Sequence, residues 1–357
     1  MVSQIVKIQG MMDPHVHLRG MDWAHKGTFA SETAAALAGG YTAVLDMPNT
    51  PPPTVNRLAL NRKLDEIGRQ AYCDWGVFFG ASQEDNVAEF DRAFVHVCGM
   101  KVYADATTGT LLVNDPALLE KLYSTWPDGK PVAFHAEGET IETILKLVRR
   151  YRKPVHFCHI STAEEINLLM TAKEARLPVT VGVTPHHLFL TEDDARTLGP
   201  KGLMKPGLKS KGDQRALWLA IDWGIVDVIE SDHAPHTLQE KASANPPYGV
   251  PGLETTLPLL GLAVQQERLS LDKLVALVAT NPRRIFGVPS QADTYTVVDL
   301  ASQYVIDARN LHTACGWSPF EGMGVAGRVL EVWIRGQKVF DGENILVAEG
   351  FGRNLYG

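Results

Sequence analysis

The sequence predicts an α/β protein: a (β/α)8 TIM barrel with a small β appendage built from both ends of the chain. Short apolar or β-branched runs occur eight times, and segments with helical periodicity separate them. Near-continuous apolar strands that alternate with helices are typical of a parallel sheet covered on both faces. Eight such units favour a closed barrel over an open sheet, and no GxGxxG motif follows the first run, which weakens a dinucleotide-binding interpretation.

The predicted barrel strands and helices follow one another in order along the chain. The first strand ends at His17, and the other seven are 41–47, 73–81, 98–104, 131–137, 154–160, 178–184 and 226–232. The predicted helices are 31–40, 54–68, 114–123, 139–152 and 161–175. Most of these helical segments begin with Ser, Thr or Asn, residues that cap helix N-termini, and they then repeat apolar residues every three or four positions.

The character of the sequence changes after about residue 290. Segments with strand-like composition follow at 294–300, 304–308, 328–342 and 345–350, and an Arg-Gly pair at 335–336 predicts a hairpin turn. The first ten residues look like one or two further strands. We therefore expect a barrel domain over 11–290 and a small composite β domain formed by 1–10 together with 291–357.

Composition and charge limit the classes of function. A hydrophobic content of 45% and a charged content of 21% describe a globular protein with enough apolar material for a large core. The formal net charge of −7, without a long basic cluster, argues against a nucleic-acid partner. The four cysteines lack a CxxC pair, and neither a secretory pattern nor a membrane-spanning apolar run is present, so we expect a cytoplasmic protein without disulfides or membrane contact.

Histidines and aspartates recur where the predicted strands end. In a strand, side chains two residues apart project to the same face, so His15 and His17 should point together toward the barrel mouth. The carboxyl ends of all barrel strands meet at that mouth, which is where active sites lie. Imidazole nitrogens and carboxylate oxygens converging there suit a borderline metal such as zinc. The residues at these strand ends are Asp13, His15, His17, His135, His159 and Asp232.

Lys101, in the predicted strand 98–104, leaves two interpretations open. A lysine removed from water in such a mouth has a lowered pKa, and its neutral amine can react with carbon dioxide to give a carbamate that bridges two metals. Alternatively, Lys101 is an ordinary lysine whose ammonium group reaches solvent at the rim. The residue types alone do not decide between the two.

Beyond these residues, the chain resembles the dihydroorotases of the amidohydrolase superfamily, of the bacterial and animal multifunctional type. The resemblance covers nearly the whole chain, and its motifs are highly specific in combination. These motifs are "DPHVHLRG", "FASETAAALAGGYTAVLDMPNTPPP", "KVYADATT", "FHAE", "FCHIST", "VTPHHLFLT", "SDHAPHTLQEK", "GVPGLETTLPLL" and "NPRRIFG".

The resemblance implies a binuclear zinc site, with two Zn2+ ions per chain. It assigns His15, His17 and Asp232 to one ion, His135 and His159 to the other, and carboxylated Lys101 with a hydroxide to the bridge between them. It also implies the reversible cyclisation of N-carbamoyl-L-aspartate to L-dihydroorotate and water, a step of de novo pyrimidine (UMP) biosynthesis. In the hydrolytic direction the hydroxide would attack a zinc-polarised ring carbonyl, and Asp232 would act as general base and then as general acid.

The same resemblance implies which residues bind the substrate. Arg19, Asn49 and His236 match the family's substrate contacts, and Arg19 can hold a carboxylate through two parallel hydrogen bonds. Asp13 would orient the neighbouring metal ligands.

At the loop and rim of the expected site, some positions match the family and others differ from it. Thr107 matches a hydroxyl on a loop that covers the bound substrate in similar dihydroorotases. Lys205 and Lys209 stand in a segment where relatives carry an arginine, which leaves that substrate contact open. Some animal relatives hold a third metal with a cysteine at the position of Cys158 and a carboxylate at the position of Gly182, so we expect no third metal by that route.

Two other functions remain as alternatives. An allantoinase or hydantoinase would use the same metals on a different ring, and an inactive dihydroorotase-like scaffold would support a partner such as aspartate transcarbamoylase. Arg19 and Asn49 favour a substrate that carries a carboxylate, and none of the expected metal ligands is missing. We therefore expect a small-molecule substrate (carbamoyl-aspartate or dihydroorotate), with a homodimer and an association with aspartate transcarbamoylase as further candidate interactions.

Overall fold

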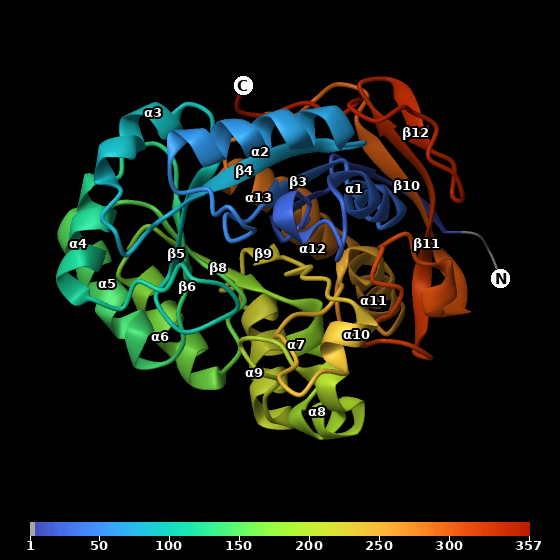
Figure 1. Cartoon of the computed structure of the whole chain (residues 1–357). Coiled ribbons are helices and arrows are strands. Elements are labelled where there is room, and N and C mark those ends of the chain that lie inside the picture. The colour runs from blue at the N-terminus through green and yellow to red at the C-terminus, as the bar shows by residue number, and fades with distance from the viewer. Residues whose placement is uncertain (1–3) are drawn as a thin grey trace.

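Eight parallel strands form a nearly closed barrel, as the sequence predicts (Figure 1). The structure, a computed structural model, describes residues 4–357. The strands pair in the order of the chain, and a parallel bridge between Val16 and His233 joins the first strand to the segment after the last. The barrel strands are β2 (Met12–Val16), β3 (Ala43–Asp46), β4 (Asp74–Gly80), β5 (Gly99–Tyr103), β6 (Val132–His135), β7 (Val155–Phe157), β8 (Val179–Val183) and β9 (Val228–Ile229).

Helices surround the ring of strands (Figure 1). Helix α5 shows why they pack there, because Ile141, Ile144, Leu145 and Val148 recur at helical spacing and are all buried. Each of the five predicted helical segments contains a helix. The helices are α1 (Phe29–Ala38), α2 (Arg57–Gln70), α3 (Phe90–Phe94), α4 (Pro116–Thr125), α5 (Glu139–Tyr151), α6 (Ala163–Glu174), α7 (Pro185–Phe189), α8 (Glu192–Leu198), α9 (Lys211–Asp222), α10 (Leu238–Lys241), α11 (Leu253–Gln265), α12 (Leu271–Val275) and α13 (Asn281–Ile285).

A separate antiparallel sheet joins both ends of the chain, in the order β1-β10-β11-β12. Its strands are β1 (Ile5–Gln9), β10 (Tyr295–Val305), β11 (Gly324–Ile334) and β12 (Gln337–Phe340). Arg335 and Gly336 form the hairpin turn, with φ of 53° and 76°. The predicted strand at 345–350 is reduced to one bridge between Phe340 and Ile345, because the segment lies at an open edge with Leu346 45% exposed. The predicted domain limits stay a prediction, and residues 1–3 of the composite β domain lie outside the described residues.

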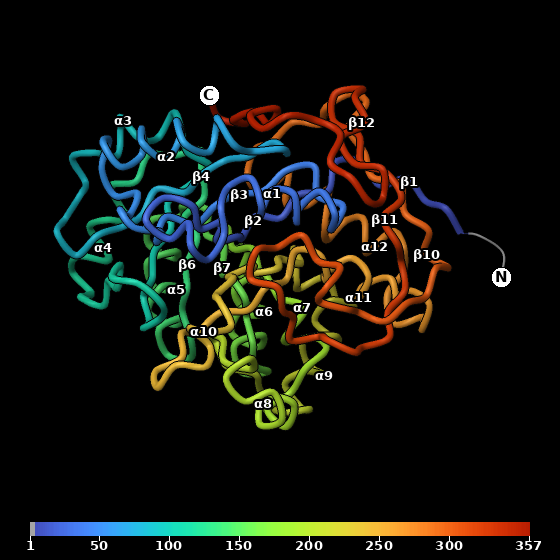
Figure 2. The backbone as a smooth tube through the Cα atoms, turned by 45° about the vertical axis from the view of Figure 1, so that its right-hand side comes forward, coloured from blue at the N-terminus to red at the C-terminus, as the bar shows by residue number. Residues whose placement is uncertain are grey.

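The two sheets are held together by close packing of α11 against β11. The chain end also returns to the barrel, where Trp75 of β4 donates to the carbonyl of Arg353 at 2.9 Å and accepts from the amide of Leu355 at 2.8 Å. Figure 2 shows the red C-terminal segment running beside α2 toward the end of the chain. Within residues 4–357, no helix combines the length and apolar character that crossing a bilayer requires.

The contact between α11 and β11 gives a test of this packing. A Cβ on Gly261 would lie 2.2 Å from the carbonyl oxygen of Ala326. Alanine gains about 1 kcal/mol in helix propensity over glycine, but the clash with a backbone atom should outweigh that gain. We expect Gly261→Ala to lower the free energy of unfolding by about 1–3 kcal/mol in urea denaturation.

Gly324→Ala is the matched control for this substitution. Gly324 begins β11, and its Cβ would meet no atom within 4 Å. If Gly261→Ala were as stable as Gly324→Ala, the close approach of α11 to β11 would be contradicted.

Candidate active site

A polar cavity opens at the carboxyl ends of the barrel strands. Its lining includes most of the residues that the sequence singles out for binding or catalysis. The lining residues are His15, His17, Arg19, Asn49, Tyr103, Thr107, Thr108, His135, His159, Lys205, Asp232, Ala234, Tyr248 and Gly249. Three predicted residues, Asp13, Lys101 and His236, do not line the cavity and are fully buried.

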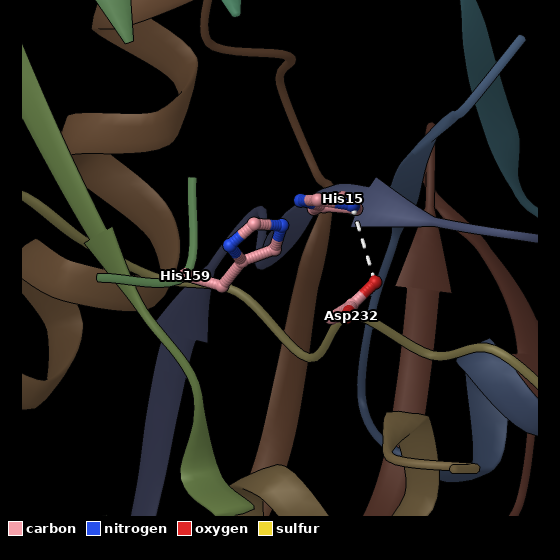
Figure 3. Close-up of side chains that lie close together, drawn as sticks. All are labelled: His15, His159 and Asp232. Carbon is pink, nitrogen blue, oxygen red and sulfur yellow. Dashed lines mark ion pairs between the residues drawn. The ribbon is translucent and has the colours of Figure 1, made fainter. Parts of the chain in front are cut away.

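His15, His17 and Asp232 form one half of the cluster. The Nε2 atoms of His15 and His17 each lie 3.2 Å from Oδ1 of Asp232. The ligand atoms of His15, His159 and Asp232 all lie within 4.8 Å of one another, and Figure 3 shows the three side chains converging. Burial opposes charge on both His15 and Asp232, but the negative charge of Asp232 raises the pKa of His15 to about 10. Conversely, His15 and His17 hold the pKa of Asp232 below its usual range despite its burial.

His135 and His159 form the other half. His135 Nδ1 and His159 Nε2 are 3.0 Å apart. Burial lowers the pKa of His135 to about 3 and that of His159 well below its usual value, so both rings are neutral near pH 7. Neutral imidazole is the form that binds metals.

Several ring nitrogens in this cluster lack a hydrogen-bond partner within residues 4–357. They are His15 Nδ1, His135 Nε2 and His159 Nδ1, all buried. A buried nitrogen without a partner is costly unless an ion or water satisfies it. The donor atoms of His15, His159 and Asp232, which lie within 4.8 Å of one another, are of the kind that divalent zinc binds. The residues present therefore fit a metal.

Lys101 extends from β5 into the same buried region. Its Nζ is 0% exposed and donates to Sγ of Cys158 at 3.1 Å. Burial alone would raise the pKa of the Cys158 thiol, but the neighbouring Lys101 lowers it. The side chain does not reach solvent, so the interpretation of Lys101 as an ammonium group at the rim does not describe this structure.

Glu230 is a buried residue of the site that sequence reasoning missed. Its carboxylate accepts from the amide of His159 at 2.6 Å and from Nε2 of His156 at 3.0 Å, and it lies 3.5 Å from Nδ1 of His15. A signal was present, because Glu230 and Asp232 lie two residues apart in the predicted strand 226–232, which would place both side chains on one face.

The position of Glu230 depends on Gly182 of β8. A Cβ on Gly182 would lie 2.6 Å from the Glu230 carboxyl carbon, so the missing side chain makes room for the carboxylate. The donor atoms of His15, Cys158 and Glu230 form a second group within 4.8 Å. Position 182 carries no carboxylate, but Glu230, directly after the neighbouring strand β9, places one in the same space. The absence of a third metal stays a prediction.

Arg19 also lines the cavity. It is 1% exposed, and burial lowers the pKa of its guanidinium to about 10, so the group remains charged near pH 7. Its Nε donates to the carbonyl of Pro235 at 2.9 Å. His236 lies behind it, with Nδ1 3.2 Å from the Lys26 ammonium and Nε2 3.0 Å from the carbonyl of Tyr248.

The tautomer of His236 bears on what Arg19 can bind. Burial lowers the pKa of His236, so its ring is neutral and has one acceptor nitrogen. Accepting from Lys26 at Nδ1 and donating to Tyr248 from Nε2 satisfies both nitrogens. The same Nε2 also lies 3.1 Å from Arg19 Nη2, which directs a hydrogen at it, so in the other tautomer this nitrogen accepts from Arg19 instead.

Asn49 connects the metal cluster to the loop after β5. Its Oδ1 accepts from His17 Nδ1 at 2.8 Å, and its Nδ2 donates to the carbonyl of Thr108 at 3.1 Å. Thr108 Oγ1 in turn donates to the carbonyl of Tyr248 at 3.1 Å. Thr107 and Thr108 both line the cavity, so this loop forms part of its wall, and its role in covering a substrate stays a prediction.

Three site residues adopt unusual backbone conformations. Arg19, His159 and Asp232 have φ of 61°, 37° and 45°, in the left-handed region that residues with a Cβ rarely adopt. Such conformations cost about 1–3 kcal/mol each and persist where the surroundings impose them, often at functional sites. The strained residues thus mark the same mouth as the polar cluster.

Comparison with known proteins agrees with this geometry. The sequence pattern of the amidohydrolase family matches residues 7–339. The chain therefore belongs to the amidohydrolase family. Its relatives are named more narrowly: it is 36% identical to the dihydroorotase of Pyrococcus furiosus over 354 residues, which cover 96% of this chain and 83% of that protein. It is also 42% identical over 355 residues to the multifunctional protein CAD of Squalus acanthias, covering 99% of this chain but only 16% of that protein.

Solved structures share the fold over almost the whole chain. The L-hydantoinase (dihydropyrimidinase) of Arthrobacter aurescens is 25% identical with a TM-score of 0.91, covering 98% of this chain and 88% of that one. An inactive dihydroorotase-like domain of a Chaetomium thermophilum CAD-like multifunctional protein has a TM-score of 0.83, covers 98% and 99%, and is 22% identical, a likeness that extends to the fold alone.

The fit of Glu230 against Gly182 can be tested by filling the space. In Gly182→Ala the new methyl group would press on a carboxylate that His156 and the His159 amide hold in place. We expect the free energy of unfolding to fall by about 1–3 kcal/mol in chemical denaturation. Gly207→Ala is the control, because a Cβ there meets no atom within 4 Å. Equal stability of the two variants would show that Glu230 is not confined in this way.

Proposed function

We propose that the chain is a dihydroorotase, which interconverts N-carbamoyl-L-aspartate and L-dihydroorotate in pyrimidine biosynthesis. The observation that carries this proposal is the buried, charged guanidinium of Arg19 on the same cavity as the His and Asp cluster. A substrate with both a cyclic amide and a free carboxylate matches this arrangement, because the His and Asp cluster would act on the amide and Arg19 would hold the carboxylate. The 36% identity to a protein named dihydroorotase supports the same substrate.

The ligand assignment follows the cluster. His15, His17 and Asp232 would hold one zinc ion, His135 and His159 the second, and Lys101, once carboxylated, would bridge them. Bound zinc would polarise the amide carbonyl and lower the pKa of a water molecule. The unpartnered nitrogens of His15, His135 and His159 support this assignment.

The chain's own residues would carry out the remaining steps. The carboxylate of Asp232 is ionised and lines the cavity, so its oxygen can accept a proton from water and return it to the amide nitrogen that leaves. Arg19 would hold the carboxylate of the substrate, and Lys205 supplies a second positive charge on the lining. Asn49 and the Thr107 loop would close the mouth and exclude water.

A hydantoinase activity is the second candidate. It is favoured by the TM-score of 0.91 to an L-hydantoinase structure. Hydantoin itself carries no carboxylate, so it would leave the Arg19 charge in the cavity without a partner, which is costly for a buried group. The third possibility, an inactive scaffold, is disfavoured because all expected metal-ligating side chains are present.

Partners follow from the relatives in the same way. Two relatives are multifunctional proteins, and the chain spans only 16% of the length of each. We infer that the protein works in the cytoplasm beside other pyrimidine-pathway enzymes, with aspartate transcarbamoylase as the candidate partner and a homodimer as the candidate assembly.

The proposed function is tested by turnover together with metal analysis. Protein prepared without chelator should contain about two equivalents of zinc and should interconvert dihydroorotate and carbamoyl-aspartate faster than it hydrolyses hydantoin or allantoin. Chelation should abolish turnover, and added zinc should restore it. Faster turnover of hydantoin or allantoin would replace the substrate assignment, and well under one equivalent of zinc would end the binuclear interpretation.

Lys101→Ala tests the bridging carbamate. Removal of the side chain should cost most of the activity and lower the zinc content, because the bridge between the two half-sites is lost. A short carboxylic acid such as propionate should partly restore both by filling the same space, whereas propionamide, which is neutral, should not. Full activity of Lys101→Ala without any additive would mean that Lys101 takes no part in the site.

Arg19→Met tests the substrate clamp. It should weaken binding of both carboxylate-bearing substrates by about 2–3 kcal/mol, the size of a lost buried charged hydrogen bond, with zinc content unchanged. Arg283→Met provides a control, because Arg283 is also buried but donates to the carbonyl of Gly10 away from the cavity. An equal rise of KM in both variants would point to a general loss of packing.

A further inference from the structure

The second sheet sends one loop back to the barrel mouth. This loop, residues 306–323, joins β10 to β11. In both Figure 1 and Figure 2 this loop is an orange-red segment that passes over α11 toward α10. Neither the proposed metal cluster nor the proposed substrate clamp includes any residue of the loop, yet its buried side chains contact Glu32 and the carbonyl of His236.

The middle of this loop, at residues 312–313, is fixed to two buried carboxylates. Glu254 accepts from the amides of His312 and Thr313, at 2.8 and 3.0 Å. Glu32 accepts from Thr313 Oγ1 at 2.6 Å and from Nε2 of His233 at 2.8 Å. His233 follows Asp232 directly, so the loop shares a partner with the catalytic segment.

Four residues further along the loop, Trp317 contacts the segment that holds Arg19. This tryptophan is 1% exposed, and its Nε1 donates to the carbonyl of His236 at 2.7 Å. The carbonyl of the preceding residue, Pro235, accepts from Nε of Arg19 at 2.9 Å. Two consecutive carbonyls are therefore held by donors from different parts of the chain, one from Trp317 and one from Arg19.

We propose that Trp317 is a positioning residue for the substrate clamp: its indole N–H fixes the Pro235–His236 segment, and that segment fixes the direction of the Arg19 guanidinium. The physical reason is that Arg19 has a long side chain, whose orientation in the cavity is set by where its Nε acceptor lies. The proposal rests on the proposed function, since it requires that Arg19 holds the carboxylate of the substrate.

The chain offers a matched control for Trp317. Trp126 is also 1% exposed, and its Nε1 also donates to a backbone carbonyl, that of Lys130 at 3.2 Å. It packs among the rings of Phe90 and Phe94, away from the cavity lining. Replacing either tryptophan with phenylalanine keeps an aromatic ring and removes one indole donor, so a purely structural cost should be similar in both variants.

The test compares Trp317→Phe with Trp126→Phe in zinc-loaded protein. Trp317→Phe should raise KM for dihydroorotate about five- to tenfold, the effect of one lost hydrogen bond, with kcat within about twofold and unchanged zinc content. Trp126→Phe should leave KM unchanged. In an Arg19→Met background, Trp317→Phe should raise KM no further, because the two residues act on the same contact.

The negative results of this test are distinguishable from one another. A parent protein that turns over dihydroorotate normally, together with an unchanged KM in Trp317→Phe or an equal rise in Trp126→Phe, would overturn the positioning role alone. A parent without dihydroorotate turnover would overturn the proposed function and this proposal with it. If Trp317→Phe does not fold, Thr313→Val loosens the same loop by removing its bond to Glu32, and an unchanged KM there would also overturn the proposal.

Discussion

The joining of the first barrel strand to the last is the constraint on which the site depends. The buried carboxylate of Asp13 accepts from the amides of His15 and Ser231, both at 3.1 Å, and the amide of His17 donates to the carbonyl of His233 at 2.7 Å. Burial raises the pKa of Asp13 to about 7, so the ring closes around a group that is unfavourable to bury. These bonds bring residues more than two hundred positions apart into one cluster.

Because the barrel closes in this way, the histidine cluster and the loop after β5 belong to one hydrogen-bond network. His17 presents Nε2 to Asp232 while its Nδ1–H donates to Asn49, which in turn donates to Thr108 of the covering loop. A hydrogen bond at one ring nitrogen fixes the tautomer and leaves the other lone pair for a metal. The position of the loop and the orientation of the His17 ring are therefore coupled through a single amide side chain.

Most of this arrangement could be predicted from the sequence, because it follows from local patterns along the chain. Strand periodicity paired His15 with His17, and the alternation of strands with helices placed His135, His159 and Asp232 at one mouth. Glu230 could have been found from its place in the predicted strand 226–232, but its contact with the His159 amide depends on how neighbouring strands pack. Trp317 carries no such signal, because it lies outside the barrel strands and its bond to the His236 carbonyl follows only from the path of a returning loop.

The space that Gly182 leaves for Glu230 constrains how this site can change by substitution. A side chain at position 182 is blocked while Glu230 is present, since the two would meet within 2.6 Å. Removal of Glu230 alone would leave His156 and the His159 amide buried without their acceptor. Each single step is therefore costly, although a chain with a carboxylate on β8 and a small residue at 230 could pack equally well. The two positions form an epistatic pair, expected to exchange their side chains together or to keep them.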